Sequence, residues 1–295
     1  YLLPLFLLFL TLSFSQKKKN SDDGIKSSDL SGLKFRSVGP AFMSGRIADI
    51  AINPQNENEW YVAVGSGGVW KTVNSGTTWK PITDDQDFYS TGCITIDPHN
   101  SSKIWLGTGE NVGGRHVGIG HGVFVSDNGG KNWKSMGLKS SEHISKIIVS
   151  PKDPNTVFVA SQGPLWSSGG ERGLFRTDNG GKTWKNVLSV NEWTGVTDIA
   201  IDHQNPDILY AATWQRHRNV ASYMGGGPGT SIYKSTDHGV TWTEIKNGLP
   251  GSNLGKIGLA ISPFDSTILY AAVETDRRNG AVYKTTNSGG SWKKM

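Results

Sequence analysis

A β-propeller, an all-β ring of four-stranded antiparallel blades, is predicted by three features of this 295-residue sequence. The chain is rich in glycine (38 residues) and tryptophan (11 residues), a composition typical of short strands joined by tight turns. A turn motif that ends in tryptophan recurs five times, and a pair of apolar segments recurs in phase with it. The repeat is about 50 residues long, which is the length of one propeller blade.

The turn motif sets the period. Its first copy reads "TVNSGTTW" and its second "SDNGGKNW", with Ser or Thr first, Asp or Asn third, Gly fifth and Trp last. Successive tryptophans are 54, 51, 58 and 50 residues apart. This regular spacing favours a propeller over a solenoid of four-stranded units, and it argues against a β-sandwich.

Each repeat contains four predicted strands. In the first repeat, "IAINPQNENEWYVAVG" combines an apolar strand, a turn and a second apolar strand that begins with an aromatic residue. The third strand, "GVWKT", alternates as a half-buried strand requires. The tryptophan of the motif then opens a short fourth strand, as in "TWKPI". Because this order returns five times, we expect five blades.

The chain before the first repeat carries three further predictions. Residues 1–15 have the pattern of an incomplete secretory signal peptide, because a short apolar run ends in Ser13-Phe14-Ser15, with small residues at the −3 and −1 positions of a cleavage site. Residues 16–32 are polar and are predicted to be a flexible leader. The propeller is predicted over residues 33–295, with Phe35 in an N-terminal closing strand. Since the fifth repeat has its own fourth strand, we expect these blades to belong to a larger ring, truncated at both ends.

The turn motifs are expected to be scaffold. Asp or Asn caps backbone N–H groups, Gly adopts positive φ, the hydroxyl closes the turn, and Trp buries its ring against a strand. No acid follows the motif at the spacing of a calcium ligand. The residues assigned to this structural role are Asn74, Gly76, Trp79, Asn128, Gly130, Trp133, Asn179, Gly181, Trp184, Asp237, Gly239, Trp242, Asn287, Gly289 and Trp292.

Charge and cysteine content exclude several classes of protein. The net charge of +5 is modest and the basic residues are scattered, so we expect no nucleic-acid partner. Cys93 is the only cysteine, which excludes an internal disulfide. It stands in an apolar strand and is expected to be a buried core residue rather than a catalytic thiol.

The turn motifs resemble the Asp-box, or BNR repeat, of sialidases, sortilin receptors and several polysaccharide hydrolases. In that family the box is a hairpin turn between the third and fourth strands on the outer rim of each blade. With "SVGPAFMSGRIADIA", "WYVAVGSGGVWKT", "GTGENVGGRHVG" and "SEHISKI", the chain resembles the secreted bacterial sortilin-like "glycosyl hydrolase BNR repeat" group from about Phe35 to Met295. This resemblance implies a secreted propeller and says little about its chemistry.

A candidate ligand face is formed by the loops between second and third strands, together with the segments that join one blade to the next. The loop is short in the first repeat ("GSGG") and long in the second (107–122), and such loops on a rigid scaffold commonly carry function. The alternative is that these loops only cover the channel mouth and pair their own charges. The predicted ligand-binding residues are Arg46, Arg115, His116, His143, Trp166, Arg172, Trp214, Arg216, His217 and Tyr223.

Glycoside hydrolysis is one chemistry that this face admits, because it needs two carboxylates about 5–10 Å apart. Glu110, Glu142, Glu171 and Glu192 are the available acids, and we assign Glu110 and Glu171 as candidate catalytic residues. The xyloglucan-cleaving Asp-box hydrolases resemble "WYVAVGSGG" but place an aspartate near Gly65 of this chain. That catalytic role therefore does not carry over to this position.

Other chemistries have weaker support. "GRIA" at Arg46 resembles the sialidase Arg-Ile-Pro string, but the proline is absent. His116 and His121 lie five residues apart without a tight ligand motif, so no metal is predicted. The glycines of "GTGENVGG" lead into a strand instead of a helix, which argues against a nucleotide site. No cofactor is expected.

We therefore expect a secreted Asp-box, sortilin-like propeller, located in the periplasm, at the cell surface or outside the cell. Its loop-rich face is expected to bind an extracellular peptide, protein or glycan. The alternative is an extracellular glycoside hydrolase that acts on poly- or oligosaccharide with loop glutamates. The apolar run of the signal peptide is too short to span a membrane, so no membrane span is expected in this part of the protein.

Overall fold

The computed structural model describes residues 31–32, 45–251, 253–275 and 280–295. The chain divides into two compact units, Tyr1–Ser37 and Val38–Met295, and only residues 31–32 of the first are described. The predicted signal peptide, most of the predicted leader and the closing strand at Phe35 lie outside the described residues. No helix in the described ranges is long and apolar enough to cross a bilayer.

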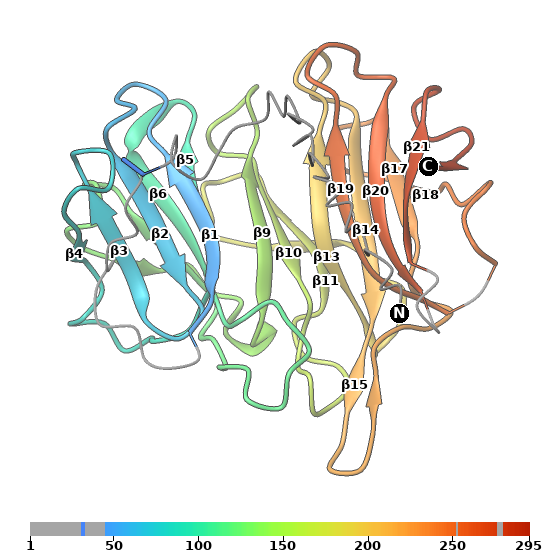
Figure 1. Cartoon of the computed structure of the whole chain (residues 1–295), viewed down its shortest axis with the longest axis horizontal. Helices are drawn as coiled ribbons and strands as arrows, with labels where there is room; N and C mark the ends of the chain where they lie inside the picture. The colour runs from blue at the N-terminus through green and yellow to red at the C-terminus, as the bar shows by residue number, and fades with distance from the viewer. Residues whose placement is uncertain (1–30, 33–44, 252, 276–279) are drawn as a thin grey trace, which may run out of the picture. The chain divides into compact units, whose positions relative to one another are not determined.

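Five four-stranded antiparallel sheets, the blades, make up the described part of the second unit (Figure 1). Within each blade the strands are hydrogen-bonded in chain order, from the first to the fourth. The predicted fold class is therefore confirmed. The strands are, blade by blade, β1 (Ile47–Ile52), β2 (Trp60–Val64), β3 (Gly68–Thr72), β4 (Lys80–Pro81); β5 (Thr91–Asp97), β6 (Asn100–Thr108), β7 (Val123–Ser126), β8 (Lys134–Ser135); β9 (Ile144–Val149), β10 (Val157–Ser161), β11 (Gly173–Thr177), β12 (Lys185–Leu188); β13 (Thr194–Ile201), β14 (Leu209–Gln215), β17 (Ile232–Ser235), β18 (Thr243–Glu244); β19 (Leu254–Ile261), β20 (Leu269–Thr275), β21 (Ala281–Thr285), β22 (Lys293–Lys294).

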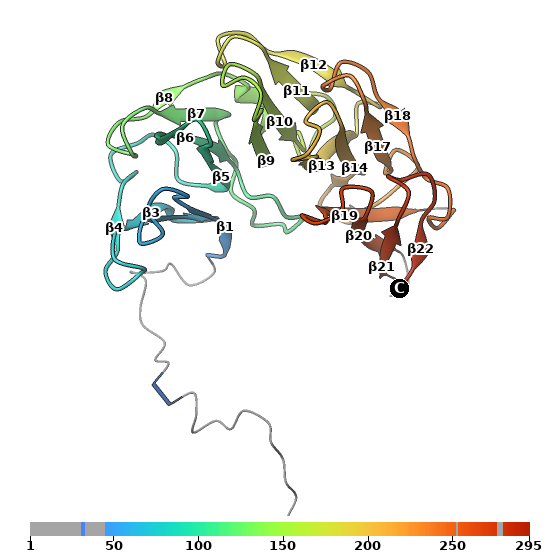
Figure 2. The same ribbon diagram turned by 90° about the horizontal axis from the view of Figure 1, so that it is seen from above.

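The blades follow one another along an arc, with their first strands on the inside and their fourth strands on the outside (Figure 2). The first strands of neighbouring blades pack together, β1 on β5, β5 on β9, β9 on β13 and β13 on β19. Together they line a cavity of about 580 Å³, which is the central channel.

Four hydrophobic cores lie between neighbouring blades, one at each interface. The two-residue period of a strand sends alternate side chains to opposite faces of a blade. In β7, Phe124 packs toward the first blade, whereas Val123 and Val125 pack toward the third. A blade therefore buries its apolar residues only against its neighbours. Cys93 lies in one of these cores and is free and buried, as predicted.

The turn motif connects the third and fourth strands in every blade. In the first copy the Thr72 hydroxyl accepts the N–H of Gly76 (2.9 Å), and the Asn74 side chain accepts the N–H of Thr78 (2.9 Å). The other four copies repeat both bonds within 2.9–3.1 Å. The motif thus satisfies its own backbone donors, which is the work of a scaffold.

The motif tryptophans also connect blades. Trp133 donates its Nε1–H to the carbonyl of Ile82 in the preceding blade (3.2 Å), and Trp184 and Trp292 make the equivalent bonds to Met136 and Ile245. In the first and fourth blades the tryptophan donates instead to its own turn.

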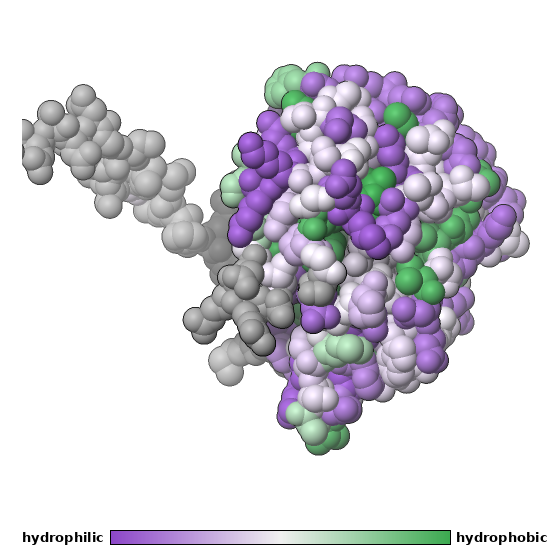
Figure 3. All heavy atoms as spheres, turned by 90° about the vertical axis from the view of Figure 1, so that its right-hand side faces the viewer, coloured by the Kyte–Doolittle hydropathy of each residue, from purple (hydrophilic) through white to green (hydrophobic). Residues whose placement is uncertain are grey.

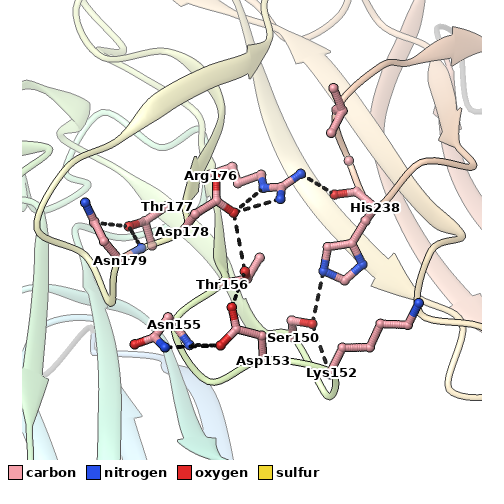
Figure 4. A network of polar contacts seen from close by, with 12 residues as sticks. Ser150, Lys152, Asp153, Asn155, Thr156, Arg176, Thr177, Asp178, Asn179 and His238 are labelled. Atoms are coloured by element: carbon pink, nitrogen blue, oxygen red, sulfur yellow. Dashed lines mark hydrogen bonds and ion pairs between the residues drawn. The ribbon is translucent and has the colours of Figure 1, made fainter.

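A second contact on the rim joins the third strand of one blade to the motif of the next. Figure 4 shows it between the third and fourth blades, where Arg176 donates to the carbonyl of His238 (2.7 Å). The His238 ring in turn contacts the Ser150 hydroxyl (3.1 Å). Lys71 and Lys234 make the corresponding bonds to the carbonyls of Gly129 and Ser288 in the following blades.

One element was not predicted. The segment 213–231 was expected to be a long loop, but part of it forms a two-stranded hairpin, β15 (His217–Arg218) with β16 (Tyr223–Met224). The cause is local, because the side chain of Asn219 accepts the N–H groups of Ala221 and Ser222 and closes the turn. The hairpin projects from the loop face at the bottom of Figure 1.

Candidate functional site

The long loop of the second blade crosses the channel mouth toward the fourth and fifth blades (Figure 2). Three consecutive backbone carbonyls of this loop accept hydrogen bonds from three cations. Lys256 Nζ donates to Asn111 (2.6 Å), Arg216 Nη1 to Val112 (2.9 Å), and Arg218 Nη2 to Gly113 (2.8 Å). The loop therefore ties together blades that are not neighbours in the arc.

Gly113 allows this close approach. A Cβ at this position would overlap the hydroxyl of Tyr223 in the hairpin. Arg115 in the same loop donates to the carbonyl of Val220 at the hairpin turn (2.9 Å), and Arg218 stacks 4.3 Å from the Tyr223 ring. The hairpin and the loop thus form one layer over the channel mouth.

Two buried arginines lie beneath this layer. Arg216 is fully buried and also donates to the carbonyl of Gly163 (3.1 Å), while its Nε has no hydrogen-bond partner among the described residues. Burial lowers the pKa of Arg216 to about 9 and that of Arg172 to about 10. Among the described residues, the Arg172 guanidinium donates to backbone carbonyls, those of Gln162, Pro164, Ser167, Gly169 and Trp193.

Glu142 lies next to these arginines, in a strained turn after a short 3₁₀ helix, η1 (Lys139–Ser141). Its φ and ψ are 56° and −36°, and the N–H of His143 donates across it to the carbonyl of Ser141 (2.6 Å). This is a γ-turn of the rare, strained kind. The carboxylate is 28% exposed, and burial raises its pKa although Arg172 and Arg216 act in the opposite direction.

His143 is buried beside Glu142 and is neutral at neutral pH. Burial lowers its pKa to about 3, and the positive charge of Arg216 acts in the same direction. Its Nδ1 lies 2.8 Å from the carbonyl oxygen of Glu110, which only accepts, so the ring proton belongs on Nδ1. Its Nε2 lies 4.0 Å from a carboxylate oxygen of Glu142.

Glu110 is the second carboxylate at this position, and only 2% of its side chain is exposed. It is ion-paired with Arg46 (2.5 Å) and accepts the N–H of Gly118 (3.1 Å). Arg46 also donates to Nε2 of His116 (3.0 Å). A Cβ at Gly65 would overlap the Glu110 carboxylate, so the absence of a side chain at residue 65 makes room for it.

Glu171, the other predicted catalytic acid, binds the 3₁₀ helix that precedes Glu142. Its Oε2 accepts the N–H (2.8 Å) and the hydroxyl (2.9 Å) of Ser140, which pins its loop to η1. Only Oε2 takes part in these bonds, so Ser140 leaves Oε1 unused. The contact by itself describes a loop anchor.

The predicted aromatic residues differ in accessibility. Trp166 is 43% exposed and Tyr223 is 40% exposed. Trp214 is buried, donates to the carbonyl of Gly225 (2.8 Å), and packs under the Arg216 and Lys256 cations at 5.1 and 5.5 Å. His217 stacks on Trp193 with ring centroids 4.2 Å apart. Trp166 and Tyr223 are thus the aromatic surfaces available to a ligand.

The predicted residues therefore fall into separate groups. Glu110, Arg46, His116 and His143 come together, whereas Arg172, Arg216 and Trp214 lie beneath the surface layer. Glu142 was among the acids placed on this face but was not assigned a catalytic role. No sequence signal marks the strained turn of Glu142, because its neighbours determine that backbone conformation.

The surface on the side of the fourth and fifth blades is mostly polar, although the hairpin exposes the apolar side chains of Val220, Tyr223 and Met224. Seen from the side of the fourth and fifth blades, it is largely hydrophilic, with apolar residues in separate small patches (Figure 3). Within the described ranges, no three His, Cys, Asp or Glu side chains gather in a metal-binding group. The face is therefore suited to a polar organic ligand.

The chain is similar in sequence to several xyloglucanases. No family model matches the chain. The xyloglucanase of Hypocrea jecorina is 27% identical over 258 residues, which is 77% of this chain and 28% of that protein. Xyloglucanase Xgh74A of Acetivibrio thermocellus is 24% identical over 261 residues (75% and 28%), and a Paenibacillus xyloglucanase is 25% identical over 276 residues (84% and 26%). The chain thus spans less than a third of the length of these relatives.

Solved structures show the same fold. An ancestral GH74 enzyme matches with a TM-score of 0.63 at 19% identity, covering 85% of this chain and 33% of its own. The Niastella koreensis GH74 enzyme also has a TM-score of 0.63, at 18% identity and with 84% and 38% covered. YCF48 bound to D1 peptide has a TM-score of 0.54 at 16% identity, with 88% and 70% covered. The fold is a β-propeller.

Proposed function

We propose that this protein is an extracellular glycoside hydrolase that acts on a poly- or oligosaccharide of the xyloglucan class. The matched relatives named above are xyloglucanases, each at 24–27% identity over three quarters or more of the chain. This supports the hydrolase alternative over the peptide-, protein- or glycan-binding role first expected. The sortilin-like Asp-box grouping and secretion are part of the same proposal, supported by the turn geometry and by the apolar run at residues 1–15.

The observation that carries the proposal is the position of Glu110. The xyloglucan-cleaving Asp-box hydrolases place an aspartate near Gly65, and here the carboxylate of Glu110 fills the space beside that glycine. In this chain the carboxylate beside residue 65 therefore comes from Glu110 in the second blade, whereas in those hydrolases it belongs to an aspartate in the first blade. Arg46 covers it and is itself 39% exposed, so its displacement would open Glu110 to a substrate.

Exposed aromatic rings supply a surface for the sugar chain. Trp166 and Tyr223 lie on the loop face with 43% and 40% of their area exposed. Flat apolar rings with polar edges suit pyranose rings, whose C–H faces stack on them. Glu171 retains its predicted role as a candidate catalytic carboxylate, since one of its oxygens is unused by Ser140.

Glycan binding without cleavage is the second candidate. One observation favours it: Glu110 is 2% exposed and ion-paired, so no solvent-facing carboxylate stands beside Gly65. In this case the aromatic rings hold the glycan and the acids support the loops. The first candidate predicts that the wild type cleaves the glycan, and the second predicts that it binds the glycan without cleaving it.

The experiment is a reducing-end assay of the purified protein on xyloglucan, with cellulose and mixed-linkage glucan as comparison substrates. We expect new reducing ends from the wild type and a loss of about 100-fold or more in kcat for Glu110→Gln, with glycan affinity retained. Glu57→Gln, an exposed acid remote from the loop face, is the control. No turnover by the wild type, together with weaker glycan binding by Trp166→Ala, would establish the second candidate instead.

A further inference from the structure

The tip of the second-blade loop, residues 111–116, is held differently from the base of the loop. Backbone hydrogen bonds fix the base, from the N–H of Glu110 to Gly118 (3.0 Å) and from that of Gly120 to Glu142 (2.8 Å). The tip forms no backbone–backbone hydrogen bond with any described residue, and none of its side chains is buried. Hydrogen bonds that involve side chains hold it instead. The tip can therefore move while its base stays in place.

Three cations hold the tip at one end. Lys256, Arg216 and Arg218 donate to three consecutive carbonyls, those of residues 111–113, at 2.6, 2.9 and 2.8 Å. In the described ranges, none of these cations forms an ion pair with a carboxylate. Charged oxygens are stronger acceptors than a carbonyl, and arginine in particular suits a carboxylate. The tip thus supplies neutral acceptors where an anion would bind more strongly.

Lys256 and Arg216 lie close enough to repel each other. Burial, and after it the positive charge of Arg216, lower the pKa of Lys256 to about 8. Arg216 is fully buried, and its Nε has no hydrogen-bond partner among the described residues. Buried charges are normally paired, and buried donors without a partner are rare. An anion at this place would offset the repulsion between the two cations.

An aromatic ring lies beside the cations. Tyr223 is 40% exposed, and the Arg218 guanidinium lies 4.3 Å from the centre of its ring. A Cβ at Gly113 would overlap the Tyr223 hydroxyl, so the tip also rests against this side chain. Sugars stack their C–H faces on aromatic rings of this kind. A ligand with a carboxylate for the cations and a pyranose ring for Tyr223 fits both features.

We propose that Lys256, Arg216 and Arg218 form a binding site for the carboxylate of an acidic sugar, which the tip covers in this structure. The ligand displaces the tip, and its charged oxygens replace the three carbonyls as hydrogen-bond acceptors. Because only molecules with a displaced tip bind, the apparent Kd rises as their fraction falls. Binding at this site requires no cleavage of a glycosidic bond, so it is measured separately from the proposed hydrolysis.

The test uses D-glucuronate, with D-glucose as the sugar without a carboxylate and acetate as the carboxylate without a ring. Ligand-observed NMR measures their binding to the 295-residue chain. We expect glucose and acetate to bind at least about 10-fold more weakly than glucuronate. Arg218→Gln should weaken glucuronate binding by about 10-fold or more, since a charged hydrogen bond is lost. Lys134→Gln, an exposed cation in β8, is the control and should bind as the wild type does.

A second variant displaces the tip and leaves the cations in place. Gly113→Ala puts a Cβ against the Tyr223 hydroxyl, so its affinity for glucuronate should rise by about 3-fold or more. Gly251→Ala is the control, because a Cβ there meets nothing within 4 Å. Trypsin reports on the tip directly, since Arg115 lies in it and is exposed. Glucuronate should speed cleavage after Arg115, whereas glucose should not.

Three results would overturn the site or its ligand. Absence of glucuronate binding to both the wild type and Gly113→Ala overturns the site. Binding that leaves cleavage after Arg115 unchanged, or that survives Arg218→Gln at full strength, places the ligand elsewhere and overturns it as well. Equal binding of acetate and glucuronate overturns the assignment of a sugar. Thermal unfolding checks that each variant is folded, and Lys256→Gln replaces Arg218→Gln if that variant is not.

Discussion

Asp237 is the one carboxylate at a motif position where the other four copies carry asparagine. Its side chain accepts the hydroxyl (2.5 Å) and N–H (2.9 Å) of Thr241, and the hydroxyl of Ser235 (2.7 Å). These hydrogen bonds, first those from Thr241, hold the pKa of Asp237 far below its ordinary value of 3.8. Asp237 thus makes the stability of this turn depend on pH.

We predict that Asp237→Asn makes the protein less sensitive to acid. A group whose pKa is lowered by folding contributes stability above its unfolded pKa, and that contribution is lost as the pH falls below about 4. Denaturant unfolding at pH 7, 4 and 2.5 measures this, and the variant should lose less stability than the wild type between pH 4 and 2.5. Asn179→Asp is the reciprocal control and should introduce the same acid sensitivity in the third blade. Parallel pH curves for wild type and Asp237→Asn would contradict the prediction.

At the scale of elements, neighbouring blades are linked by a recurring hydrogen bond on the rim. It runs from the third strand of one blade to the turn motif of the next. A basic residue at the penultimate position of β3, β11 and β17 donates to the carbonyl of the residue before the motif glycine of the next blade. The second blade has Val125 at this position, and Trp184 still links it to the third blade through Met136. Each interface between blades therefore has at least one of two hydrogen bonds, from the basic residue of the third strand or from the motif tryptophan.

We predict that Arg176→Met lowers the free energy of unfolding by about 1.5–3 kcal/mol, since it removes a charged donor from the carbonyl of His238. The comparison variant in the same 295-residue chain is Lys284→Met. Lys284 lies 5.6 Å from the ring of Tyr270 in the fifth blade, and its loss should cost about 0.5 kcal/mol or less. Urea denaturation measures both. Equal effects of the two changes would show that the rim bond adds nothing.

At the scale of the whole propeller unit, Val38–Met295, two kinds of connection hold the blades. Hydrophobic cores join each blade to its neighbours, which by itself gives the chain-like coupling of a repeat protein. The loop of the second blade adds a long-range connection, because Arg216 and Lys256 bind it from the fourth and fifth blades.

We predict that replacing residues 111–116 by Gly-Gly weakens the fifth blade from a distance. Lys256 would lose the carbonyl of Asn111 and remain a buried cation without this partner. Hydrogen exchange followed by mass spectrometry should show faster exchange in β19 and β20. The strands β3 and β4 are the internal control, because the side-chain hydrogen bonds that involve residues 111–116 go to other elements. Unchanged protection of β19 and β20 would mean that the crossing loop carries no coupling.

The amino-acid pattern alone predicts the blade repeat, the four antiparallel strands of each blade and the turn motif between the third and fourth strands. These features are local and periodic: alternation decides which side chains face each neighbour, and the motif bonds span at most four residues. Cys93 could be placed in the core for the same reason. The loop face was also foreseeable, because strand order decides on which side the connections lie.

The contacts of the loop residues, in contrast, depend on how distant parts of the chain pack together. Arg172, Arg216 and Trp214 were expected to meet a ligand, yet Arg216 reaches a carbonyl 104 residues away and Trp214 is covered by the cations around it. The residues next to Glu142 in the sequence do not predict its strained turn. The turn is held by a contact with another blade, because the N–H of Gly120 donates to the carbonyl of Glu142. These hydrogen-bond partners are far apart in the sequence and meet only because the blades pack together. The amino-acid composition of a loop therefore does not predict them.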